Sequence, residues 1–209
     1  MFMAEAQQTT IVKKTKGKIV DTWKAKSWYS VIAPDIFSNK EIGNVVSSDE
    51  ENLINRRVKA TLSELTGSLG MSNAYTSLNF RIREVKGKNA YTDFIGHELA
   101  PAYLRTLARR RRSVINCVKD IRTRDGVKYR IKVTVVSGVR ISDFAKSSVR
   151  RVLQEEIGQQ GSKADFNEYV SEVLFGKAAQ KLYNRLKKIV PVRKVEIHKS
   201  EVMREVKKG

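Results

Sequence analysis

The segment between residues 114 and 136 constrains the fold most, because two runs of alternating apolar and polar residues there flank a turn sequence. Alternation with a period of two is typical of strands that bury one face. The turn Arg124-Asp125-Gly126 fits a three-residue loop whose glycine takes the left-handed conformation. A two-residue loop would place Ile121 opposite Arg130 and mix the two faces, so we predict the longer loop. The predicted register pairs Ile115 with Val135, Cys117 with Val133, Ile121 with Tyr129, Asp120 with Arg130 and Arg122 with Lys128.

The remaining patterns predict a protein that mixes strands and helices. Strands are expected at residues 28–34, 58–65, 74–85, 90–95 and 192–199, and helices at 98–110, 143–158, 166–175 and 177–188. Asp165, with Glu168 three positions later, resembles a capping box at the start of the third helix. Residues 1–20 are expected to form a basic extended tail, residues 21–203 a single domain, and residues 204–209 a short basic C-terminal tail.

Positive charge is concentrated in the middle of the chain. The whole sequence has a net charge of +19, from 41 Lys and Arg against 22 Asp and Glu. Residues 101–151 contain 15 basic residues and 3 acidic ones, which gives a local charge of +12. Like charges held together repel one another and lower stability, so this arrangement indicates a polyanionic partner. Nucleic acid is the commonest partner of this kind, and an anionic membrane surface is the second.

The sequence lacks the residue patterns of the common catalytic and metal sites. Cys117 is the only cysteine, which excludes an intramolecular disulfide and a zinc site built on cysteines. The two histidines are about a hundred positions apart, and we expect His97 to have a structural or surface role near a helix start. There is no nucleophile elbow and no phosphate-binding glycine loop. We therefore predict no catalytic residue, no metal site and no cofactor.

Basic side chains supply the candidate RNA contacts, because guanidinium groups pair with phosphate oxygens at two points. The strongest candidates are Lys13, Lys14, Lys16 and Lys18 in the tail and the run Arg109, Arg110, Arg111 and Arg112. The others are Lys24, Lys26, Arg105, Arg122, Lys128, Arg130, Lys146, Arg150 and Arg151. The sequence leaves open whether these elements form one surface.

Two tryptophans flank the lysines at 24 and 26, and they have two alternative roles. An indole beside lysines can stack on a nucleic-acid base. It can also anchor the tail onto the core. We favour anchoring for Trp28 and leave both roles open for Trp23.

Several runs of residues resemble one protein family. They include Trp28-Tyr29-x-Val31-Ile32-Ala33-Pro34, Leu62-x-x-Leu65-Thr66-Gly67, Gly96-His97-Glu98-Leu99, Phe175-Gly176-Lys177 and Pro191-x-Arg193-Lys194-Val195-Glu196-Ile197. In this order and spacing they resemble the eS1 family, also called S3Ae, of small-subunit ribosomal proteins of archaea and eukaryotes. The resemblance covers about residues 18–203, and the short C-terminal end is similar to the archaeal form. The chain departs from the family's pattern at residues 55–59 and in its first ten residues.

The resemblance implies an α+β fold with an antiparallel, barrel-like sheet core, several packed helices and RNA-contacting tails. It implies a place on the platform of the small ribosomal subunit, near the 3′ end of its RNA and the messenger exit region. The implied partners are small-subunit ribosomal RNA, neighbouring platform ribosomal proteins and, as a further candidate, messenger RNA. It implies no catalysis, so we expect a structural RNA-binding protein of the ribosome.

Two other functions stay open. A non-ribosomal nucleic-acid-processing protein such as a nuclease needs clustered carboxylates that hold magnesium. The acids of the basic region, Asp120, Asp125 and Asp143, fit instead an ion-pair partner, a turn residue and a helix cap. A peripheral membrane protein ranks last, because the predicted helices lack a strongly apolar face opposite a basic one. No run of 18 apolar residues and no apolar N-terminal signal core is present, so we expect a cytoplasmic protein without membrane contact.

Overall fold

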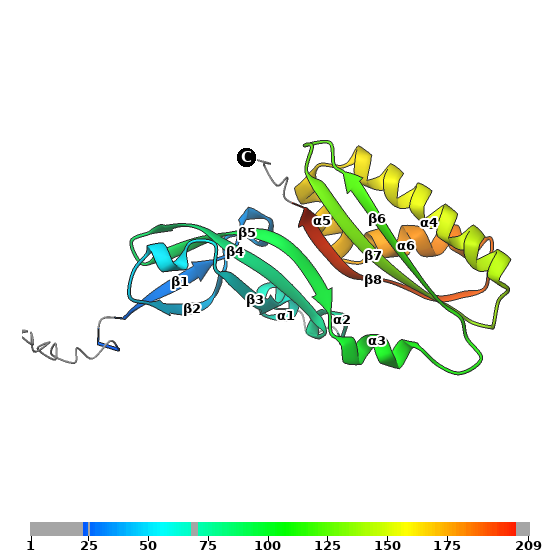
Figure 1. Ribbon diagram of the computed structural model, residues 1–209, viewed down its shortest axis with the longest axis horizontal. Coiled ribbons are helices and arrows are strands. Elements are labelled where there is room, and N and C mark those ends of the chain that lie inside the picture. The colour runs from blue at the N-terminus through cyan, green and yellow to red at the C-terminus, as the bar shows by residue number, and fades with distance from the viewer. Residues whose placement is uncertain (1–22, 25, 68–70, 204–209) are drawn as a thin grey trace, which may run out of the picture.

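The computed structural model describes residues 23, 24, 26–67 and 71–203 (Figure 1). Its strands are β1 (Ser27–Ile32), β2 (Glu41–Ser47), β3 (Arg57–Thr61), β4 (Thr76–Lys86), β5 (Asn89–Leu99), β6 (Val114–Arg122), β7 (Lys128–Ser137) and β8 (Val192–Met203). Its α-helices are α1 (Leu62–Thr66), α2 (Met71–Ala74), α3 (Pro101–Leu107), α4 (Asp143–Lys163), α5 (Phe166–Leu174) and α6 (Lys177–Leu186). Two 3-10 helices, η1 (Asp35–Phe37) and η2 (Glu51–Leu53), complete the elements. The predicted α+β class is confirmed.

One sheet joins all the described strands and branches at β5. Its main path runs β2-β1-β5-β8-β7-β6, while β4 lies along the other edge of β5 and pairs in turn with β3. β1 pairs with β5 in parallel, and every other pairing between described strands is antiparallel. These strands do not close on themselves, so the expected barrel-like core is an open, mostly antiparallel sheet.

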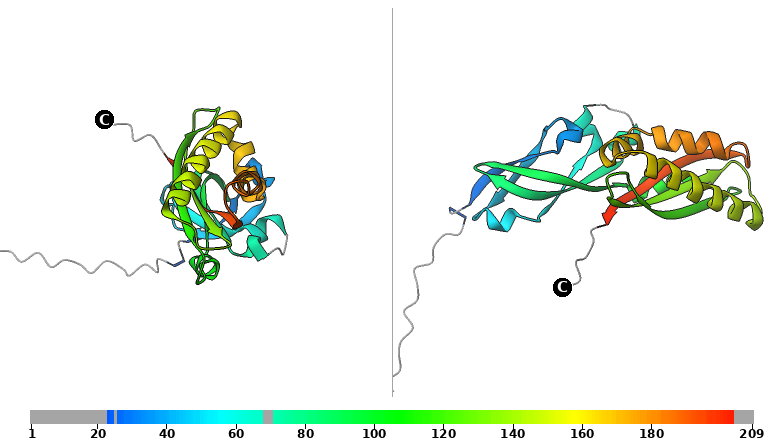
Figure 2. Two further views of the ribbon diagram at one scale, coloured as in Figure 1. Left: turned by 90° about the vertical axis from the view of Figure 1, so that its right-hand side faces the viewer. Right: turned by 90° about the horizontal axis from the view of Figure 1, so that it is seen from above.

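The long hairpin of β4 and β5 connects two lobes (Figure 1). The first lobe holds β1 to β5 with the short helices α1 and α2. The second holds β6, β7 and β8, and Figure 2 shows α4, α5 and α6 gathered on one face of these strands. A continuous apolar core runs from Ala33 and Phe37 in the first lobe to Leu186 and Ile197 in the second. On the opposite face of the second-lobe sheet, α3 lies at one end, where Tyr103 donates a hydrogen bond to Glu196 (3.0 Å).

The predicted hairpin is confirmed in its register. β6 and β7 place Ile121 opposite Tyr129 and Asp120 opposite Arg130. Gly126 has the expected left-handed backbone (φ 81°), which a glycine adopts without strain. The apolar face is covered closely by α4, because a Cβ at Gly161 would lie 2.4 Å from a side-chain carbon of Ile121.

The helix predicted at 98–110 is wrong at both ends, because α3 spans only Pro101–Leu107. Glu98 and Leu99 belong to β5, where β8 pairs His97 with Ser200 and Glu98 with Lys199. α3 begins only at Pro101, whose fixed φ suits the first helical turn. His97 therefore lies buried inside a strand, which fits a structural role and excludes a surface one.

The strand predicted at 58–65 is wrong in its second half. β3 ends at Thr61, and Thr61 caps α1 through a capping box with Glu64. Gly67 ends α1 in the left-handed conformation (φ 68°). The sequence Thr-Leu-Ser-Glu has the spacing of a capping box, so the signal for this helix was present.

Two predicted helix caps are also wrong. Asp165 stands at the N-cap of α5, but its side chain makes no capping hydrogen bond. Asp125, in the β6–β7 turn, takes that role, because its carboxylate accepts a hydrogen bond from the Phe166 amide (2.7 Å). α4 is capped by the Ser142 hydroxyl and not by Asp143.

Candidate nucleic-acid interface

The four consecutive arginines lie in the loop between α3 and β6. Arg109, Arg110 and Arg111 are exposed, and Arg112 is half-buried. Arg111 has a left-handed backbone (φ 61°), an uncommon conformation for a residue with a side chain, which turns the loop toward β6. The loop thus spreads guanidinium groups around one end of the second-lobe sheet.

Two adjacent hollows bring cations from other elements to this loop. The first, of about 500 Å³, is lined by Arg111, Arg112, Arg140 and Lys146 together with Ser113 and Val114. The second, of about 240 Å³, has Arg109, Arg112, Arg193 and Lys194 among its lining residues. Arg112 lines both hollows. We use the name arginine cluster for the set Arg109, Arg111, Arg112, Arg140 and Arg193.

Among the described residues the arginine cluster has little acidic compensation: Asp143, whose pKa is lowered mainly by Lys146, also feels the charge of Arg140. The two lysines of the hollows have partners, Lys146 with Asp143 (2.7 Å) and Lys194 with Glu196 (2.9 Å). No described carboxylate forms an ion pair with an arginine of the cluster. The pKa of Arg112 lies below its usual value, because of burial and then because of the charges of Arg193 and Arg109. Adjacent guanidinium groups of this kind bind phosphate oxygens strongly.

Of the other predicted RNA contacts that the structure describes, only Lys146 lines either of these two hollows. Arg105 on α3 and Arg110 in the loop are exposed but line neither hollow. Arg150 and Arg151 are exposed on α4, and Arg151 pairs with Glu155 (3.3 Å).

The basic residues of the hairpin lie at the far end of β6 and β7. The length of β6 puts Arg122 roughly 26 Å from the arginine cluster, at about 3.3 Å per residue. Lys128 pairs with Arg122 across the strands. Arg130 donates two hydrogen bonds to Asp120 (2.6 and 2.8 Å), and this contact lowers the pKa of Asp120. The predicted basic elements therefore do not form one surface.

Two of the N-terminal candidates, Lys24 and Lys26, lie beside β1, at the opposite end of the molecule from the arginine cluster (Figure 1). Lys24 and Lys26 are exposed just before β1, whereas Lys13, Lys14, Lys16 and Lys18 lie outside the described residues. Trp28 is 63% exposed, so the predicted anchoring of its indole in the core is wrong. Trp23 is equally exposed, and Lys26 Nζ lies 4.5 Å from the centre of its ring.

Sequence reasoning missed two members of the arginine cluster. Arg140 follows β7, and Arg193 is the second residue of β8. The pairing of β7 with β8 sets Val136 opposite Lys194, and the pairing of β6 with β7 sets Val114 opposite Val136. These two pairings carry Arg193 to the arginine loop. The local sequence does not predict that Arg193 lies near the arginine loop, because this depends on long-range strand order.

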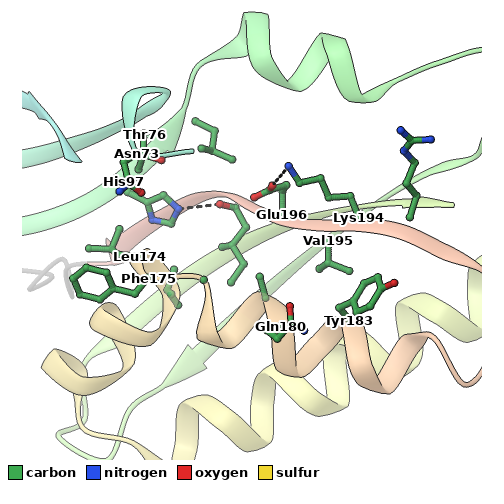
Figure 3. Close-up of a pocket in the computed structure, with 16 residues that line it drawn as sticks. Asn73, Thr76, His97, Leu174, Phe175, Gln180, Tyr183, Lys194, Val195 and Glu196 are labelled. Atoms are coloured by element: carbon green, nitrogen blue, oxygen red, sulfur yellow. Dashed lines mark hydrogen bonds and ion pairs between the residues drawn. The ribbon is translucent and has the colours of Figure 1, made fainter. Parts of the chain in front are cut away.

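A third hollow, of about 530 Å³, lies where β5 and β8 meet the turn between α5 and α6 (Figure 3). Its histidine is fully engaged. His97 Nε2 donates to the Ile197 carbonyl (2.9 Å), so Nδ1 accepts from the Ser200 hydroxyl (2.5 Å), which accepts in turn from Tyr129 (2.5 Å). Burial lowers the pKa of His97 to about 4. This histidine is therefore a structural link between strands and not a catalytic base.

The thiol and the carboxylates that could serve a catalytic site are buried or already have partners. Cys117 is buried, and burial raises the pKa of its thiol, so it is a poor nucleophile. The acids of the basic region are separately engaged: Asp120 with Arg130, Asp125 with the α5 amide, and Asp143 with Lys146. Within the described ranges, no group of three or more His, Cys, Asp and Glu side chains could hold a metal ion.

A helix that spans a membrane needs about 20 mostly apolar residues. No helix in the described part of the chain meets that requirement of length and apolarity.

Comparison with known proteins covers both lobes. The profile of the Ribosomal S3Ae family matches residues 14–206. The small ribosomal subunit protein eS1 of Saccharolobus islandicus is 39% identical over 188 residues, which cover 90% of this chain and 89% of that protein. The protein of the same name from Methanococcus vannielii is 37% identical over 193 residues, with coverage of 91% and 87%. The matched region includes every arginine of the cluster.

Proposed function

The chain belongs to the Ribosomal S3Ae family, and from this premise we propose that it binds small-subunit ribosomal RNA through the arginine cluster. Its relatives are small ribosomal subunit proteins, so the chain is a structural constituent of that subunit in the cytoplasm and not an enzyme. The finer part of the proposal is its place on the platform, near the messenger exit region. Neighbouring platform proteins and messenger RNA are the further partners proposed there.

The observation that carries the proposal is the set of five guanidinium groups that form no ion pair with a described carboxylate. Some cations elsewhere do have carboxylate partners, as with Lys181 and Glu172 (2.6 Å) or Arg185 and Glu156 (3.0 Å). Five like charges left together around two hollows destabilise the free protein and are relieved by a polyanion. RNA phosphates supply that charge at the spacing of a backbone, and their binding releases counterions.

The remaining basic candidates would extend this contact. We propose that Lys13, Lys14, Lys16 and Lys18 bind RNA phosphates as a tail, and that Arg122, Lys128, Arg150 and Arg151 make secondary contacts. We further propose that residues 21–203 act as one RNA-binding unit, which the continuous apolar core through both lobes supports.

The test replaces Arg109, Arg111 and Arg112 together by Gln and measures binding to small-subunit ribosomal RNA across a range of salt concentrations. Loss of three phosphate contacts should lower the slope of log affinity against log salt by about 2 to 3, and the affinity about a hundredfold at roughly 0.15 M salt. The fold should be unchanged, because these side chains bury little.

The matched control replaces Arg83, Lys181 and Arg185 by Gln. It removes the same charge from cations that already have carboxylate partners, so the slope should change by less than about 1. Equal effects of the two triple variants would show that binding depends only on net charge. That result would contradict the site assignment.

A further inference from the structure

RNA binding by the arginine cluster leaves the exposed Trp28 unexplained. Its indole is 63% exposed although it stands on a paired strand. Tryptophans are on average well buried in folded proteins. β1 lies at one end of the molecule and the loop between α3 and β6 at the other (Figure 1). The indole therefore belongs to a different surface from the arginine cluster.

Strand pairing shows what shares a face with this indole. Tyr29 and Val31 alternate with Trp28 and point into the small core of the first lobe. Across the strands Trp28 stands opposite Val46, and Ile32 stands opposite Tyr91 of β5. Paired residues project to the same side of a sheet. We call the resulting outer surface the tryptophan face and define it by Trp28, Ser30, Asn44, Val46 and Tyr91.

Cations border the tryptophan face at both ends. Lys26 precedes β1 and lies over the Trp23 ring. Lys86 Nζ lies 5.6 Å from the centre of the Tyr91 ring. The turn that follows Lys86 is held beside β1, since the Lys88 carbonyl accepts a hydrogen bond from the Ser30 amide (2.8 Å). Aromatic rings with lysines beside them are the combination that proteins use for single strands of nucleic acid.

Carboxylates also lie near the tryptophan face, and they weaken its electrostatic attraction for phosphates relative to stacking. Glu84 pairs with Lys86 (3.2 Å), and the loop after β2 carries Asp49, Glu50 and Glu51. Attraction of phosphates is therefore weaker here than at the arginine cluster. Most of the affinity must come from stacking on the rings, which is available only where bases are unpaired.

We propose that the tryptophan face binds single-stranded RNA, with unpaired bases stacked on Trp28 and then Tyr91 and with Lys26 beside the phosphates. This inference rests on the proposed RNA-binding function but concerns a second surface and a different form of RNA. The two hollows of the arginine cluster have no aromatic residue among their described lining residues, so that cluster reads the backbone and not the bases.

The experiment uses the full chain and an unstructured single-stranded RNA of about eight nucleotides, within the usual range of such sites. Affinity is measured by the anisotropy of labelled RNA, for the wild type and for Trp28→Leu and Trp28→Tyr. Trp28→Leu should bind about tenfold more weakly, and Trp28→Tyr should recover most of the loss because it restores a ring. Quenching of tryptophan fluorescence should accompany binding to the wild type, since its only two tryptophans are Trp23 and Trp28.

Two comparisons keep the outcomes separate. The triple glutamine variant of the arginine cluster should retain the single-strand binding that Trp28→Leu loses. Binding of duplex RNA should be weakened by the triple glutamine variant and retained by Trp28→Leu. Wild-type binding to duplex but not to single strands, or equal single-strand affinity of wild type and Trp28→Leu, would overturn this inference and leave the proposed function standing. Failure to bind either form of RNA would overturn both. If Trp28→Leu binds single strands normally yet is lost from the subunit, the face contacts a protein.

Discussion

Acidification should weaken the joint between the two lobes, because unfolding there releases a histidine that the folded protein keeps neutral. His97 on β5 receives a hydrogen bond from Ser200 on β8 and donates one to the Ile197 carbonyl. Ser200 Oγ already accepts from Tyr129 and from the His97 amide (3.2 Å), so it is poorly placed to accept a further proton from Nδ1. Burial adds the larger cost, since a charged imidazole would lose its water.

The size of the effect follows from the pKa of His97 in the two states. It is 6.5 in the unfolded chain and about 4 in the folded one, so the unfolded chain binds more protons between these values. Stability is therefore complete above pH 6.5 and falls as the pH drops toward 4. The whole shift corresponds to about 3 kcal/mol, of which about 2 kcal/mol should be lost between about pH 7 and about pH 5. Carboxylates with lowered pKa, such as Glu201 beside Lys199, contribute their losses at lower pH.

The assay is urea unfolding of the wild type and of His97→Gln at about pH 7, 6 and 5. The variant removes the titrating group but keeps a side chain that can accept and donate, so its stability should change little over this range. His198 also has a lowered pKa, because of burial, and it remains in both proteins. Parallel pH dependence in the two proteins would refute the reasoning. Direct titration of the His97 ring by NMR gives an independent reading, and a pKa near 6.5 would refute it as well.

Two further predictions concern packing and capping. Gly96→Ala should lower the free energy of unfolding by more than about 2 kcal/mol, because the new Cβ would lie 2.0 Å from the Ser200 carbonyl oxygen. Gly158→Ala on α4 meets nothing within 4 Å and should raise the free energy of unfolding by about 0.5–1 kcal/mol. Thermal unfolding of both variants checks this, and an equal response would contradict the close approach of β5 and β8. Asp125→Ala should lower the free energy of unfolding by about 1 kcal/mol, because α5 loses its cap, and Asp165→Ala should lower it clearly less. A larger loss from Asp165→Ala in urea unfolding would show that Asp165, as the sequence predicts, caps α5.

The β6–β7 hairpin was predictable because two independent signals agree there. The alternation fixes which side chains share a face, and the glycine at position 126 fixes the loop length. A shift by one residue would expose Ile121 and bury Arg130, so only one register satisfies both. The apolar stripe of α5 was predictable for the same reason, since Tyr169, Val170 and Val173 recur at helical spacing and are buried.

The errors occur where distant segments decide the local structure. Residues 98 and 99 have a helical pattern with those that follow, but Glu98 pairs with Lys199 of β8, about a hundred positions away, and Leu99 pairs with Thr76 of β4. Asp125 caps a helix that starts 41 residues later. Trp28 was expected to anchor the tail onto the core, and only the pairing of β1 shows that it faces outward. The run of arginines was visible in the sequence, whereas Arg140 and Arg193 join it only through strand order.

The central claim is that the arginine cluster holds the chain on ribosomal RNA. The most direct measurement is sedimentation of cell lysate through sucrose gradients at increasing salt, followed for the wild type and for the triple glutamine variant of Arg109, Arg111 and Arg112. The account predicts that the wild type migrates with small ribosomal subunits until high salt releases it, and that the variant is released at clearly lower salt. Migration of the wild type as a free protein at low salt, or release of both proteins at the same salt concentration, would contradict it.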